Sequence, residues 1–597
     1  MERNIILQSR KEIYNHLDNK HLKQAFIRLR EFIKPLTDWH YQEKAEELET
    51  AYQYMLRYMG DGLNDPDRDK LYRKLLSDTY KLTDIVTDVF LQKSDSSIYY
   101  SKRRVFLSGA DSLDAAYKRL ENEYNNLSLA ELVETDKQQS EEKKKIFDLE
   151  RKAEDALIVL FNAIWTNFNP TPEERLLLQE IFSPVALSPN YQANLISALT
   201  LSLLHWYDES KLFLLMDLTS SENEILSQRA LVGLLLIIQI HSKRALTTSS
   251  VENRLSTLLE NDSLVNRIRT IQMQLIRTRE TERITRKLND EILPEMMKMA
   301  PPLYNKIKTD DLLNDSGESD MNPEWEDFIE KAGIGDKLKE ISELQMEGSD
   351  VLMSAFSNLK TFPFFQHVSN WFLPFFKENS ALTTSLSTDK QNDLFFGFIS
   401  KSRFMCNSDK YSFCLSLSQM PEIQRSMMLD QFSAQGEELE QLSKMDDAET
   451  PLKKTENISN LYIQDLYRFF KLHPQHIEFE DPFNKDILLF RNPLLKSLFS
   501  DIDTLHLLGE MFFRKQFYQD AISVYRDLTQ LDHSNSEFFQ KLGYCYQSMG
   551  AYEKAISAYK QADIIHPDST WTLRRLALCF RNLKKPAEAL SYYERFN

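Results

Sequence analysis

Glycine, proline and cysteine are scarce in this chain. The 597 residues include 13 glycines, 19 prolines and four cysteines. Few glycines and prolines argue against an all-β architecture with many tight turns and favour long helices. The cysteines, Cys406, Cys414, Cys545 and Cys579, are too few for a disulfide framework. They suit a reducing compartment, and we predict a cytoplasmic protein.

The sequence also lacks the local signatures of common catalytic and cofactor sites. It contains no G-x-x-x-x-G-K-[ST], no G-x-G-x-x-G, no H-E-x-x-H and no G-x-S-x-G. The 11 histidines are scattered without ligand spacing, and Cys406 and Cys414 have no second pair with which to complete a zinc site. We therefore predict no enzyme activity, no cofactor and no metal. Catalysis by residues distant in sequence stays an alternative.

Positive charge and long apolar runs are in short supply as well. The formal net charge is -17, which disfavours a general nucleic-acid binder because such binding rests on neutralising phosphates. The most apolar runs, residues 193–204 and 230–240, fall short of the about 20 residues that span a bilayer and predict buried helices. The first ten residues contain no apolar signal-peptide core, so we expect no signal peptide.

What the chain does contain is a repeat with a period of 34 residues at its C-terminal end. Aromatic, leucine and alanine residues recur there at fixed offsets. The aligned sets are Leu505, Phe539 and Leu573; Leu508, Leu542 and Leu576; Phe512, Tyr546 and Phe580; Ala521, Ala555 and Ala589; and Tyr525, Tyr559 and Tyr593. This pattern resembles the tetratricopeptide repeat (TPR) family over residues 502–597, a series of helix–turn–helix units.

The second repeat, residues 536–569, matches the family pattern best. It has Gly543 and Ala555 where the two helices of a repeat are expected to cross, and Pro567 where the second helix ends. Three repeats are about the minimum for a stable array. No polar capping helix follows the third repeat, so we expect Tyr592 and Phe596 to be exposed. The alternatives are that the chain is truncated, that this end packs on the upstream region, or that a partner covers it.

The TPR resemblance implies a ligand groove lined by the first helix of each repeat. His506 and Glu510 stand where two residues of the family's carboxylate clamp would be, so a peptide C-terminus is not the expected ligand. The mixed character of the groove points instead to an internal peptide or a protein surface, and the alternative is that these residues are merely solvated. The groove positions carried over from the family are His506, Glu510, Phe513, Arg514, Gln540, Tyr544, Gln547, Arg574, Leu578, Arg581 and Asn582.

The rest of the chain reads as helical segments with short polar breaks. We predict an all-α fold in which a helical-hairpin solenoid leads to an aromatic-rich middle domain and the TPR array. The resemblance of the solenoid part to HEAT-type repeats is loose. The predicted parts are a helical region at 1–92, a solenoid-like region at 98–300, an acidic linker or mobile loop at 309–330, a middle domain at 331–500 and the TPR repeats at 502–597.

Two segments carry the rival functions. Residues 264–288 form a basic helix that could grip nucleic acid, or could be a solvated face that pairs with the acidic remainder. The aromatic clusters at 362–365, 371–376 and 395–398 predict a local core, with an exposed partner patch or an enzymatic pocket as alternatives. Our main prediction is a protein–protein interaction scaffold or adaptor that binds an unidentified protein or peptide through the TPR groove.

Overall fold

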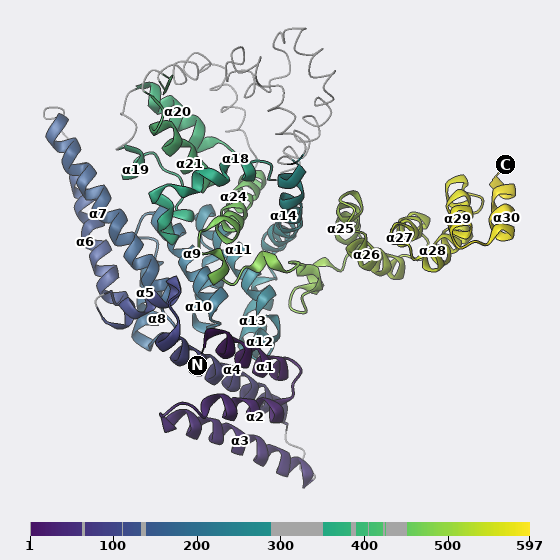
Figure 1. Ribbon diagram of the computed structural model, residues 1–597, viewed down its shortest axis with the longest axis horizontal. Coiled ribbons are helices and arrows are strands. Elements are labelled where there is room, and N and C mark those ends of the chain that lie inside the picture. Colours follow the sequence, from purple (N-terminus) through teal and green to yellow (C-terminus); the bar gives the residue numbers. More distant parts are fainter. Residues whose placement is uncertain are drawn as a thin grey trace. The chain divides into compact units, whose positions relative to one another are not determined.

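The computed structural model describes residues 2–61, 66–109, 111–132, 139–287, 290, 350–383, 390–403, 405–421, 424–425 and 451–596. In these ranges every regular element is an α-helix or a short 3-10 helix, and there is no strand (Figure 1). The predicted all-α class is therefore confirmed. The chain divides into two compact units, Met1–Leu488 and Leu489–Asn597.

The first unit begins with four helices that match the pattern expected for residues 1–92. The third starts at Trp39 and ends at Gly60, and the fourth starts at Arg68. Apolar side chains at helical spacing, such as Ile6, Ile13 and Leu17, are buried. The four helices are α1 (Arg3–Asp18), α2 (Leu22–Ile33), α3 (Trp39–Gly60) and α4 (Arg68–Ser94).

The predicted solenoid-like region continues the first unit as successive helices. Its local signals are obeyed: Thr171 and Glu174 form the reciprocal capping box that starts α8. The helices are α5 (Ile98–Leu107), α6 (Leu113–Leu132), α7 (Gln139–Thr166), α8 (Pro172–Ile181), α9 (Pro189–His205), α10 (Glu209–Leu218), α11 (Glu224–Ile240), α12 (Ser242–Ala245), α13 (Ser249–Leu258) and α14 (Asp262–Lys287).

The two most apolar runs lie in α9 and α11, which pack against each other in the core of the first unit. Gly233 permits this contact, because a Cβ atom there would lie 2.4 Å from Thr200 Oγ1. Both runs are buried, as predicted. Among the described residues, no helix is long and apolar enough to cross a membrane.

The aromatic-rich segment packs as a core. Prolines interrupt it, and it forms short 3-10 turns rather than one helix. Trp371 and Phe372 are fully buried, and the indole N–H of Trp371 donates to the Phe365 carbonyl at 2.9 Å. The elements here are α18 (Met353–Ser357), η3 (Asn358–Thr361), η4 (Pro363–Gln366), η5 (Val368–Trp371), α19 (Ser380–Thr383), α20 (Lys390–Lys401), α21 (Asn407–Ser418), α24 (Pro451–Leu472), η6 (His476–Glu478) and η7 (Pro482–Asn484).

The second unit contains three helix pairs after two short 3-10 turns. The pairs lie side by side in chain order (Figure 1). The elements are η8 (Leu489–Arg491), η9 (Lys496–Phe499), α25 (Ile502–Arg514), α26 (Tyr518–Leu531), α27 (Ser536–Ser548), α28 (Tyr552–Ile565), α29 (Thr570–Asn582) and α30 (Pro586–Phe596). The predicted linker at 309–330 and the side chain of Phe596 lie outside the described residues, and the other predicted domain boundaries stay predictions.

Candidate partner-binding groove

The three helix pairs of the second unit share one turn geometry. The turn inside each pair places one residue in the left-handed backbone region: Gln516 at φ 61°, Gly550 at φ 75° and Lys584 at φ 57°. These positions are 34 residues apart, like the sequence period. A side chain in this conformation costs roughly 1–2 kcal/mol, so its recurrence at Gln516 and Lys584 indicates a turn imposed by the packing of the helix pair.

A glycine facing a buried tyrosine allows the helices of a pair to approach. A Cβ atom at Gly543 would lie 2.6 Å from the Tyr559 ring, and one at Gly509 would lie 3.1 Å from the Tyr525 ring. Both rings are fully buried. The atoms nearest to the Gly543 position belong to Tyr559 rather than to Ala555, which we expected there. The small residue is needed to admit an aromatic ring and not only to bring two backbones together.

The first helices of successive pairs contact one another through aromatic rings. Phe513 on α25 lies 5.3 Å from Tyr544 on α27, and Tyr544 lies 6.5 Å from Trp571 on α29, measured between ring centroids. Gln540 on α27 also donates to Thr572 on α29 at 2.9 Å. The three first helices therefore share one continuous surface, with an aromatic row along it.

The sequence-predicted groove residues divide into two groups. His506, Glu510, Phe513, Gln540, Tyr544, Gln547 and Leu578 are half-buried, whereas Arg514, Arg574, Arg581 and Asn582 are exposed. The structure brings His506 to Glu510 and Phe513 to Tyr544. Gln547 instead accepts a hydrogen bond from Tyr559 on the second helix of its own repeat at 2.9 Å. Its amide therefore also helps to fix the buried tyrosine.

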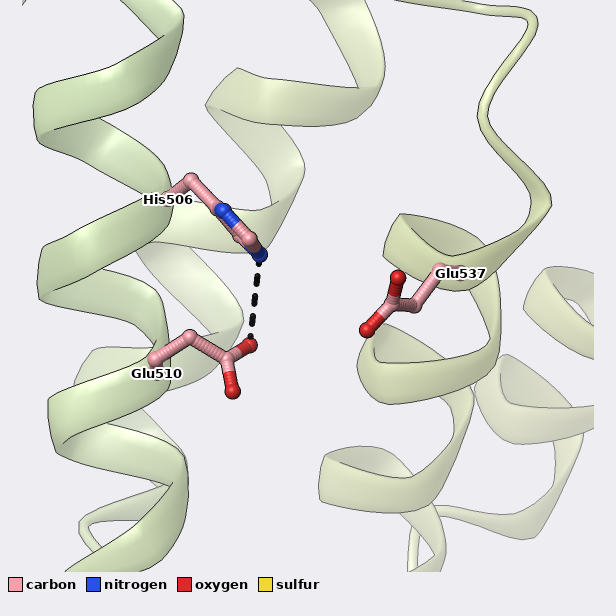
Figure 2. A group of neighbouring side chains, drawn as sticks. All are labelled: His506, Glu510 and Glu537. Carbon is pink, nitrogen blue, oxygen red and sulfur yellow. Dashed lines mark ion pairs between the residues drawn. The ribbon is translucent and has the colours of Figure 1, made fainter.

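A cluster of charged and polar side chains on this surface joins α25 to α27. His506 Nε2 lies 3.5 Å from Glu510 on the same helix, and Glu537 faces them from the next repeat (Figure 2). One ligand atom from each lies within 4.8 Å of the others, and imidazole and carboxylate are metal-binding groups. However, the Lys541 ammonium pairs with Glu510 and, at 2.6 Å, with Glu537. The position that a metal ion would take beside these carboxylates is thus held by a lysine.

Hydrogen bonds favour the charged forms of Glu510 and Lys541. Burial alone would raise the pKa of the Glu510 carboxyl, but hydrogen bonds from Lys541 and Tyr525 hold that pKa below its usual range. Burial would likewise lower the pKa of Lys541, yet Glu510 and Glu537 raise it. Glu510 and Lys541 are therefore held in their charged forms at neutral pH and form an ion pair across the α25–α27 junction.

Comparison with known proteins identifies the repeat. Two family models, each described as tetratricopeptide repeat, match residues 536–563 and 572–597. Residues 536–597 are a TPR segment. The pair α25–α26 precedes the matched residues and has the same helix lengths as α27–α28, 13 and 14 residues. No curated protein matches the chain.

Three residues of this first-helix surface escaped the sequence reasoning: Lys541, Trp571 and Arg575. Trp571 stands 34 residues after Glu537, and Arg575 stands 34 after Lys541. Lys541 and Arg575 each follow a predicted position, Gln540 and Arg574, by one residue, so extending those positions along the helix would have found them. Trp571 is not adjacent to any predicted position. Trp571 is 40% exposed, and the Arg575 guanidinium lies 5.0 Å over the Tyr544 ring and 5.1 Å over the Trp571 ring.

The two segments of the first unit that suggested other functions, the basic helix α14 and the aromatic segment, make contacts within that unit. On α14, Arg277 lies 3.9 Å from Glu456, and Arg279 lies 3.2 Å from Asp486. These arginines pair with carboxylates of the first unit itself, as the solvated-face interpretation expected. In the described part of the aromatic segment, Phe365, Trp371 and Phe372 are buried, as the local-core interpretation expected.

Proposed function

We propose that this protein is a non-catalytic interaction scaffold whose TPR groove binds an extended segment of a partner protein. TPR repeats generally mediate protein–protein interactions, and their architecture is typical of scaffold proteins without catalytic activity. A preformed groove on stacked helices binds with little ordering cost of its own. A cytoplasmic location remains part of this proposal.

The observation that carries the proposal is the aromatic row Phe513–Tyr544–Trp571 on the first helices. Aromatic side chains supply most of the binding energy at many protein interfaces. Trp571 leaves 40% of its surface exposed at the end of this row. An apolar side chain that covered it would gain both buried area and ring contacts.

The experiment is a co-purification from the native cell with identification of bound proteins by mass spectrometry. The groove variant combines Tyr544→Ala with Arg574→Glu. The matched control combines Leu531→Ala with Arg526→Glu, because both of these residues are exposed on α26, the second helix of the first repeat. We expect a partner that is retained by the control and lost from the groove variant, with both variants equally helical by circular dichroism. A partner set that is the same for both variants would refute binding through the groove.

A further inference from the structure

The cations of the TPR segment are concentrated in its third repeat. Residues 570–597 contain six Lys or Arg and two Glu, whereas residues 502–535 contain three Lys or Arg and five Asp or Glu. The basic residues of the third repeat are Arg574, Arg575, Arg581, Lys584, Lys585 and Arg595. On the first helices alone, α29 carries Arg574, Arg575 and Arg581 and no carboxylate, whereas α25 carries Asp503, Glu510 and Arg514. The first-helix surface is therefore polarised along its length, in a chain whose net charge is -17.

The two ends of the groove differ in how their cations are used. At the α25–α27 end, Lys541 is neutralised by Glu510 and Glu537. At the α29 end, Arg574, Arg575 and Arg581 have no carboxylate partner within the described residues. An acidic group would meet two carboxylates at the first end and unpaired guanidinium groups at the second.

Arg575 is the best placed of these cations. Its guanidinium lies over the faces of both Tyr544 and Trp571, and it is half-buried between the second and third repeats. Stacking on two rings limits the rotamers of a long side chain before a ligand arrives. The donors of a guanidinium match a carboxylate in a two-point contact, which is stronger than a contact between neutral groups.

We infer that the groove recognises an internal Asp or Glu of an extended partner segment, bound by Arg575, with a neighbouring apolar residue packed on Trp571. This rests on the proposed groove function and adds the partner's chemistry and direction. The acidic residue of the partner segment contacts α29. The part of the segment that reaches α25 is neutral or basic, because Glu510 and Glu537 face it there. Leu578, one turn after Arg574 and half-buried, extends the apolar contact.

The test is a selection of random peptides of about twelve residues displayed on phage, fused so that no free C-terminal carboxylate is present. The full-length chain is the bait. In this test the groove variant is a different one, Tyr544→Ala plus Trp571→Ala, which removes two rings of the aromatic row. We expect a consensus with an Asp or Glu beside an aromatic, aliphatic or proline residue. Binding of a synthetic consensus peptide is then measured by fluorescence anisotropy. Replacing its acidic residue by Asn should weaken binding by about tenfold or more.

Variants of the arginine make the test specific. Arg575→Gln should weaken the peptide by about tenfold or more, Arg575→Lys should restore part of the loss because it keeps charge without the planar fork, and Arg526→Gln on α26 should leave binding unchanged. A neutral or basic consensus that the groove variant loses would overturn the acidic-segment inference and leave the groove function standing. The absence of any consensus that depends on Tyr544 and Trp571 would overturn both.

Discussion

A buried charge network in the first unit allows a quantitative prediction. Asp409 on α21 is fully buried, and its carboxylate lies 2.8 Å from Arg468 Nε on α24 and 2.9 Å from Lys360 Nζ on η3. Burial alone would raise the pKa of Asp409, but Arg468 and Lys360 hold that pKa below its usual range. The carboxylate is therefore ionised at neutral pH and links three elements that are far apart in the sequence.

The substitution Asp409→Asn removes this charge with little change of shape. Arg468 keeps a second carboxylate, Asp350, at 2.9 Å. Among the described residues, Lys360 then keeps the ring faces of Phe365 at 4.7 Å and Trp371 at 5.8 Å, and such contacts offset about 2 kcal/mol when they are shielded from water. Breaking a buried ion pair from one side costs about 3–5 kcal/mol, because an uncompensated charge stays inside. Because the ring contacts offset part of this cost, we predict that Asp409→Asn lowers the free energy of unfolding by about 3–4 kcal/mol, the lower half of this range.

The assay is hydrogen exchange of the α21 and α24 amides, read together with the thermal unfolding midpoint. Local exchange is the better measure because a chain with two units need not unfold in one step. The control is Asp114→Asn, which breaks a pair with Lys118 whose side chains are 60% and 65% exposed, and it should leave stability nearly unchanged because solvent screens an exposed pair. Adding Lys360→Met to Asp409→Asn should recover part of the loss. A change below about 1 kcal/mol for Asp409→Asn, or no recovery in the double variant, would refute the reasoning.

Three further predictions concern stability: one rests on a contact of a glycine and two rest on buried titratable side chains. Gly543→Ala should lower the stability of the TPR segment by roughly 1–2 kcal/mol, because the clash with the buried Tyr559 ring outweighs the gain in helix propensity; urea unfolding measures it. Burial and nearby arginines lower the pKa of His205 and His241 to about 3, so each should cost about 2 kcal/mol of stability between pH 7 and pH 5, where only the unfolded chain binds the proton. Burial raises the pKa of Glu154 to about 7, so the protonated folded state should gain stability as the pH falls from 7 towards 4.5, and Glu154→Gln should abolish that dependence in exchange measurements.

Each of these predictions has a control within the chain. Gly397→Ala on α20 makes the same change where nothing lies within 4 Å of the new Cβ, so it should be neutral or slightly stabilising. If both glycine variants behave alike, the ring contact has no energetic role. For the pH dependence, His241→Gln should remove its share of the loss below pH 6.5, and an unchanged profile would contradict the assignment. A Glu154→Gln variant that keeps the wild-type pH profile would show that another group titrates there.

The local features of this protein follow from its sequence. The 34-residue period and the burial of the two apolar runs were predicted and are confirmed, and the Thr171 cap that begins α8 is likewise a local feature of the sequence. Each of these rests on helix periodicity, capping or run length, which are decided by residues within a few turns of one another. The all-α class was predicted from the helical periodicity of the segments, and the scarcity of glycine and proline supported it.

Only the tertiary structure decided which side chains meet. Arg277 and Arg279 of α14 lie next to Glu456 and Asp486, about two hundred residues away in the sequence, so these two cations of the basic helix are paired within the fold. The atoms nearest to Gly543 belong to the Tyr559 ring, and the Arg575 guanidinium lies over two rings from different repeats. The sequence places residues on helix faces, but ion pairs and ring contacts depend on which helices the chain path brings together, and that is a property of the packed molecule.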